Sequence, residues 1–135
     1  MNTKLTNHEK GEVVIVEVRG ELTFGEGTLA LRSNIRMLVD GGFTRILLNM
    51  AGVTYIDSSG IGELVAAYTS VTTAGGEIKL LNLAKRPHDL LKITKLYTVF
   101  ETFEDETSAV ASFSATRQAN PLSLDRPITG IEQVS

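Results

Sequence analysis

The fold is decided by residues 46–65, which read ILLNMAGVTYIDSSGIGELV. The apolar run at its start lies in a segment, 44–50, that is too short for an independent helix and is bounded by Gly42 and Gly52, so it predicts a central strand. From Ile61 onward apolar residues recur at helical spacing, which predicts an amphipathic helix closing at Gly75-Gly76. Its apolar positions are Ile61, Leu64, Val65, Tyr68 and Val71. The polar stretch 57–59 therefore marks the point where a buried strand turns into a helix.

The rest of the chain continues this alternation of strands and helices. Val13 to Val18 is rich in β-branched residues and predicts a largely buried strand, with residues 4–9 pairing to it through the turn at 10–12. Further strands are expected at 77–83 and near 99–103, and helices at 28–40, after Pro87, and at 106–113 with Asp105 as the N-cap. This order predicts an α/β protein with helices packed on a mixed sheet.

Composition limits the class of protein further. With 135 residues, 42% of them hydrophobic, the chain predicts a single domain with one core. A formal net charge of −3 argues against nucleic acid and anionic membranes as partners. There is no cysteine and the only histidines, His8 and His88, are far apart in the sequence, so no metal site is expected. We find no secretory signal and no apolar run of about 20 residues, so we expect a cytoplasmic protein without membrane insertion.

The C-terminal residues have a different pattern. From Thr116 onward no helical or strand period is sustained, and two of the chain's three prolines occur there. We therefore expect a domain over residues 1–115 and a tail over 116–135. Two alternatives stay open for this tail: it is mobile, or it docks Leu122, Leu124 and Ile128 loosely on the domain.

The chemistry of the chain is concentrated where the second helix begins. The first turn of a helix has unpaired backbone N–H groups and the positive end of the helix dipole, so Ser58 or Ser59 could serve simply as the N-cap. Gly60 and Gly62 fit that role poorly because glycine weakens a helix, and their missing side chains would let another protein approach the Ser58 hydroxyl. A helix N-terminus also tolerates an added phosphate, so the segment is compatible with a phosphorylation switch.

Other chemistries do not fit this segment. A nucleophile elbow needs glycines two residues before and after the serine, and a dinucleotide loop or P-loop needs residues that are missing here. An aspartyl-phosphate receiver centred on Asp57 would need an acidic pair after the first strand and a lysine after the last, and neither is present. No general base can be named for either serine, so we expect no enzyme activity, no catalytic residues and no cofactor.

Four blocks, in this order, resemble the STAS domain family, and within it the bacterial anti-sigma factor antagonists. They are 18–22 (VRGEL), 46–62 with the Asp-Ser-Ser-Gly turn, Gly75-Gly76 before a strand, and Pro87 through Phe100. The resemblance covers about residues 4–114. It implies a STAS fold with a four- to five-stranded mixed sheet and about four helices, packed mainly on one face.

The resemblance also implies a function. In proteins like these, the serine directly after the aspartate, here Ser58, is phosphorylated by an anti-sigma factor with serine kinase activity and dephosphorylated by a PP2C-type serine phosphatase. The unphosphorylated form binds the kinase and releases a sigma factor, and phosphorylation ends that binding. ATP and magnesium would belong to the kinase. The residues expected to form the partner-binding switch loop are Glu21, Thr23, Asp57, Ser59, Gly60, Ile61 and Gly62, with Ser59 as the expected helix cap.

Two departures from the family pattern stand out. Thr23 occupies a position where related proteins often have aspartate, which could alter the choice of partner, and Lys95 replaces a frequent glycine. We assign Phe24 and Gly25 to the partner surface as well. Two other functions stay open: a STAS subunit of a membrane lipid-transport complex, and a scaffold component of a stress-sensing assembly.

Overall fold

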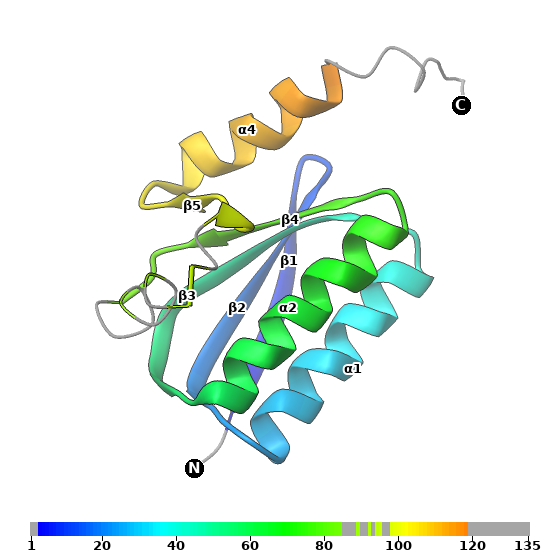
Figure 1. Cartoon of the computed structure of the whole chain (residues 1–135). Coiled ribbons are helices and arrows are strands. Elements are labelled where there is room, and N and C mark those ends of the chain that lie inside the picture. Colours follow the sequence, from blue (N-terminus) through cyan, green and yellow to red (C-terminus); the bar gives the residue numbers. More distant parts are fainter. Residues whose placement is uncertain (1–2, 85–88, 90–91, 93, 96–97, 119–135) are drawn as a thin grey trace.

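The computed structural model describes residues 3–84, 89, 92, 94–95 and 98–118, with side chains through Phe113. Its strands are β1 (Lys4–Lys10), β2 (Val13–Leu22), β3 (Arg45–Ile56), β4 (Glu77–Leu81) and β5 (Thr102–Phe103). Its helices are α1 (Glu26–Asp40), α2 (Ser58–Thr73) and α4 (Glu106–Gln118). The strands form one five-stranded sheet in the order β1-β2-β3-β4-β5, with β1 antiparallel to β2 and the later pairs parallel (Figure 1).

Helices α1 and α2 cover the same face of the sheet. Each connects two neighbouring parallel strands, β2 to β3 and β3 to β4, and the sheet grows in the same direction both times. Because such crossovers are right-handed, both helices must lie on one side, as Figure 1 shows. Alternate strand residues such as Val14, Val16 and Leu48 are buried beneath them in the larger core cluster.

Helix α4 lies on the opposite face of the sheet (Figure 1). The strand residues that alternate with the larger core, Ile15 and Leu47 among them, form a second core with Ala109 and Phe113 of α4. Lys79 of β4 is 5% exposed within this layer. Its ammonium group lies 2.8 Å from Glu101 Oε1, 2.9 Å from Ser112 Oγ and 4.7 Å from the centre of the Phe113 ring. The contacts with Ser112 and Phe113 tie α4 to the sheet.

The expected α/β class and five-stranded mixed sheet are confirmed. Residues 4–10 pair with 13–19 around the predicted turn, and Asp105 Oδ2 accepts a bond of 2.8 Å from Ser108 N at the start of α4, as predicted. Three helices are described as whole elements, α1 and α2 on one face and α4 on the other, and the described residues Asp89 and Lys92 are also helical. The helix expected after Pro87 falls largely outside the described residues.

Several element boundaries differ from prediction: β2 continues to Leu22, past Val18, whereas β4 ends at Leu81 and β5 covers only Thr102–Phe103. Helix α1 begins at Glu26, and α4 continues through Gln118, past the expected end near Phe113. Strand β3 runs on to Ile56, although Gly52 was expected to bound it. A side chain at position 52 would meet the Arg19 side chain of β2 at 2.8 Å, so this glycine allows close strand pairing instead of ending the strand.

Two further features belong to the fold. Lys95, at the position where glycine was noted as frequent, has a φ of 63°, a left-handed conformation that glycine adopts most easily. In the part of the chain that the structure describes, no helix is both long and apolar enough to cross a membrane.

Candidate functional site

The predicted switch segment lies at the carboxyl end of the parallel strands. Leu22, the last residue of β2, is paired with Ile56, the last residue of β3. The loops that follow, 23–25 before α1 and Asp57 before α2, are therefore neighbours, and both helices begin at this end of the sheet (Figure 1). Ligands and partners of open α/β sheets commonly bind at this end.

Asp57 connects the two loops through its carboxylate. Oδ1 accepts a hydrogen bond of 2.9 Å from Gly60 N, and Oδ2 accepts one of 3.2 Å from Phe24 N. The Gly60 bond is the main reason why the pKa of Asp57 is lowered, with the Phe24 bond also contributing and partial burial opposing it. Asp57 is therefore ionised at neutral pH and holds the β2–α1 loop against the start of α2.

Asp57, not a serine, is the N-cap of α2, so the expectation that Ser59 caps this helix is wrong. An aspartate satisfies a helix N-terminus as well as serine does, and here its second oxygen also reaches a neighbouring loop. Ser58 is the first residue of the helix and is exposed, whereas Ser59 is half-buried. Because capping is carried out by Asp57, the structure assigns no capping role to the Ser58 side chain.

The two glycines of the turn have different surroundings. A Cβ atom on Gly60 would overlap Leu22 O and lie 2.6 Å from Ile56 Cγ1, so Gly60 lets α2 pack directly on the strand ends. A Cβ atom on Gly62 would have nothing within 4 Å. The bare surface inferred from the sequence therefore exists at Gly62 only, because Gly60 and Ile61 are buried.

The β2–α1 loop presents Phe24 to solvent, with 82% of the residue exposed. Thr23 O accepts a hydrogen bond of 3.2 Å from Thr28 N, and Gly25 O accepts one of 3.0 Å from Leu29 N. Gly25 has a φ of 101°, in the region that favours glycine. The backbone around Phe24 is thus held by hydrogen bonds on both sides while its ring lies in water.

The remaining predicted residue, Glu21, lies near the end of β2 and is half-buried. Its backbone carbonyl accepts a hydrogen bond of 2.6 Å from Thr3 Oγ1. The structure therefore brings Glu21, Thr23 and residues 57–62 to one end of the sheet, of which Ser58 and Gly62 are exposed.

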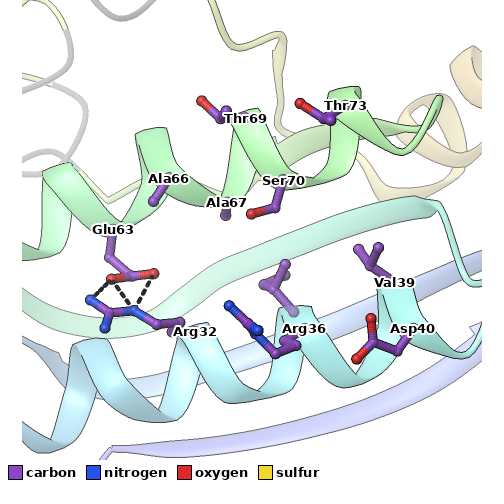
Figure 2. A pocket seen from close by; sticks show the side chains of 11 residues that line it. Arg32, Arg36, Val39, Asp40, Glu63, Ala66, Ala67, Thr69, Ser70 and Thr73 are labelled. Carbon is purple, nitrogen blue, oxygen red and sulfur yellow. Dashed lines mark hydrogen bonds and ion pairs between the residues drawn. The ribbon is translucent and has the colours of Figure 1, made fainter.

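An ion pair links α1 and α2 near this site. Arg32 Nη2 lies 2.9 Å from Glu63 Oε1, and Glu63 is 5% exposed. This pairing raises the pKa of Arg32. The pair lines one end of a groove of about 470 Å³ between the two helices (Figure 2). Sequence patterns gave no sign of this pair, because its members are 31 positions apart.

The arrangement defines a class of protein: an α/β domain in which an exposed serine begins a helix, beside a loop that is hydrogen-bonded to the same turn. The chain belongs to the STAS domain family, whose model matches residues 4–109.

Individual relatives agree with this assignment. The chain is 25% identical over 115 residues to the anti-sigma F factor antagonist of Paenibacillus polymyxa, covering 82% of this chain and 94% of that protein. It is 28% identical over 101 residues to the anti-sigma-B factor antagonist of Bacillus subtilis, covering 75% and 91%.

Solved structures show the same fold. A candidate anti-sigma factor antagonist from Thermotoga maritima matches with a TM-score of 0.76 at 21% identity, covering 82% of this chain and 94% of that chain. The phosphorylated form of the Bacillus cell fate determinant SpoIIAA matches with a TM-score of 0.64 at 21% identity, covering 82% and 98%. The fold also matches 19% of the murine anion transporter Slc26a9, with a TM-score of 0.66 at 22% identity over 84% of this chain.

Proposed function

We propose that this protein is an anti-sigma factor antagonist that is switched by phosphorylation of Ser58. The observation that carries the proposal is the exposed Ser58 hydroxyl, directly after a capping aspartate and beside a loop held to the same turn. Relatives that the chain covers almost completely are named as antagonists of anti-sigma factors, which supports the same role here. The chain itself would act by binding, with the chemistry supplied by its partners.

In the phosphorylation step, the Ser58 oxygen would attack the γ-phosphorus of ATP held by an anti-sigma factor with serine kinase activity. The bond from that phosphorus to the β,γ-bridging oxygen breaks, ADP leaves, and the hydroxyl proton passes to a base of the kinase. Water attack on the phosphoserine, catalysed by a PP2C-type serine phosphatase, would restore the hydroxyl and release inorganic phosphate. For this step the chain must give the kinase access to the hydroxyl, which the exposed position of Ser58 supports.

The site also supports a switch that acts on binding and leaves the fold intact. A phosphoserine carries about −1.5 to −2 charges at neutral pH. The dipole of α2 favours that charge, and no acidic residue lies in the first turn of the helix. The neighbouring Asp57 carboxylate, by contrast, repels it. An interface that buries this turn would have to desolvate both charges, so phosphorylation should release the partner.

A second candidate function is a STAS subunit docked on a membrane transporter, favoured by the match of the same fold to part of an anion transporter. In that case Ser58 would be a contact residue rather than a phosphate acceptor. The two candidates differ in whether a kinase modifies Ser58.

The deciding experiment is phosphorylation by purified serine-kinase anti-sigma factors from the source organism, with ATP and magnesium, followed by mass spectrometry. We expect one phosphate on the wild-type chain, none on Ser58→Ala, and one on the matched control Ser59→Ala. Ser58→Glu should bind the kinase at least tenfold more weakly than the wild type. If every kinase leaves Ser58 unmodified, or Ser58→Glu binds as tightly as wild type, the proposed switch is wrong.

A further inference from the structure

Several exposed large apolar residues lie in the segments that precede or follow the strand ends near Ser58. Among the described residues, Phe24, Leu29 and Tyr55 are large hydrophobic residues that are 82%, 54% and 42% exposed. Phe24 lies in the β2–α1 loop, Leu29 in the first turn of α1, and Tyr55 two residues before Asp57. All three belong to the carboxyl end of β2 and β3 or to the turns that follow. We call these three residues the apolar rim.

Phe24 is the most exposed member, and its backbone is held in place. Its N–H donates to Asp57 Oδ2 at 3.2 Å, and the residues on either side of it accept hydrogen bonds from α1. An aromatic ring on a preorganised loop loses little additional entropy when it is buried against a partner. Aromatic residues are also enriched in the buried centres of protein interfaces. Phe24 therefore has the properties of a binding anchor.

The chemistry of the loop indicates what it would contact. Residues 23–25 are threonine, phenylalanine and glycine, so the loop offers an apolar ring and no charge. The complementary surface is an apolar pocket. Because the Phe24 amide is bonded to the carboxylate next to Ser58, the loop that carries this exposed ring lies beside the Ser58 turn.

We infer that Phe24 anchors the interface by inserting into an apolar pocket of the anti-sigma factor, with Leu29 and Tyr55 at its border. The inference rests on the proposed function and adds a residue that determines partner specificity. Phosphorylation at Ser58 and apolar docking at Phe24 then act on one interface. The Phe24 ring strengthens binding of the unphosphorylated form, and a phosphate on Ser58 weakens that binding.

The test measures binding of the unphosphorylated chain to the anti-sigma factor that modifies or binds it in the preceding experiment, by isothermal titration calorimetry. Phe24→Ala should raise Kd about tenfold to a hundredfold, the range expected when a buried phenylalanine contact is lost. Phe24→Leu should keep most of the affinity. The matched control is Met37→Ala, which changes a residue that is 57% exposed in the last turns of α1, far from the Ser58 end of that helix, and should change Kd less than twofold.

The outcomes are distinguishable. Since Phe24 is exposed, Phe24→Ala should unfold at the same temperature as wild type, so a weaker Kd would not reflect a damaged fold. If wild type binds and Phe24→Ala binds within twofold of it, the rim inference is overturned while the proposed function stands. If Phe24→Ala instead abolishes self-association seen by analytical ultracentrifugation, the rim is a dimer surface and the inference is also overturned. If wild type binds no anti-sigma factor, both proposals fail.

Discussion

Gly60→Ala should destabilise the protein, although alanine is normally the better helix residue. Gly60 lies in the first turn of α2, where the helix rests on the ends of β2 and β3. An added methyl group would overlap the carbonyl oxygen of Leu22 and lie 2.6 Å from Ile56 Cγ1. The side chain of Ile56 can rotate, but the carbonyl is part of a paired strand. The helix start would therefore have to move away from the sheet.

The size of the effect follows from two opposing contributions. Overpacking in a well-packed site costs about 1–3 kcal/mol, and a backbone obstacle favours the upper part of that range. Replacing glycine by alanine in a helix returns less than about 1 kcal/mol. We expect a net loss of about 2 kcal/mol in the free energy of unfolding, which corresponds to a fall in Tm of roughly 5–10 °C.

Gly62→Ala is the matched control, two residues further along the same helix. Nothing lies within 4 Å of the added methyl group, so only the helix contribution remains and stability should rise by about 0.5–1 kcal/mol. Urea unfolding followed by circular dichroism measures both variants. If Gly60→Ala proves as stable as wild type, or if the two variants change in the same direction, our account of the helix–strand contact is refuted.

Three further predictions concern stability. Asp57→Ala should lower the free energy of unfolding by about 1–2 kcal/mol at neutral pH, because the cap of α2 is lost. Because hydrogen bonds lower the folded-state pKa of Asp57, its stabilisation is present above the unfolded-state pKa of about 4 and is lost as pH falls through the lowered folded-state pKa. Urea titrations of wild type and variant should therefore converge as the pH is lowered below about 4, and a constant gap would contradict the assignment. The free energy of unfolding of Lys79→Met should stay within about 1 kcal/mol of the wild-type value, because an apolar side chain fits among the aromatic neighbours of Lys79. Lys79→Ala should lower it by about 2–4 kcal/mol, because it leaves a cavity. Equal losses in the two variants would show that the charge of Lys79 matters more than its volume. Lys95→Gly should raise the free energy of unfolding by about 1 kcal/mol, because glycine adopts the left-handed backbone of this position without strain. The control Lys92→Gly, at a helical residue, should lower it by a similar amount. Calorimetric melting curves measure both, and a change in the opposite direction in either variant would contradict the prediction.

Local patterns predicted much of the architecture. The β-branched run from Val13, the helical spacing after Ile61 and the aspartate at position 105 were interpreted correctly because each signal acts over a few residues. Local patterns were less successful at boundaries. Gly52 carries the signal of a strand end, but its pairing with Arg19 of the neighbouring strand, where a side chain at position 52 would not fit, shows why β3 continues.

At the candidate site, the sequence by itself determined that a serine begins a helix after a buried strand, because strand period, helix period and polar turn residues are local properties of the chain. Only the tertiary structure decided which glycine of the turn is buried, which phenylalanine is exposed, and which distant loop the capping aspartate also reaches. Asp57 reaches a loop 33 residues away, and the buried Glu63 is paired with Arg32 on the adjacent helix. Those outcomes depend on how distant segments pack. Burial and long-range hydrogen bonds are made with residues from other parts of the chain, and local sequence patterns do not show which parts will become neighbours.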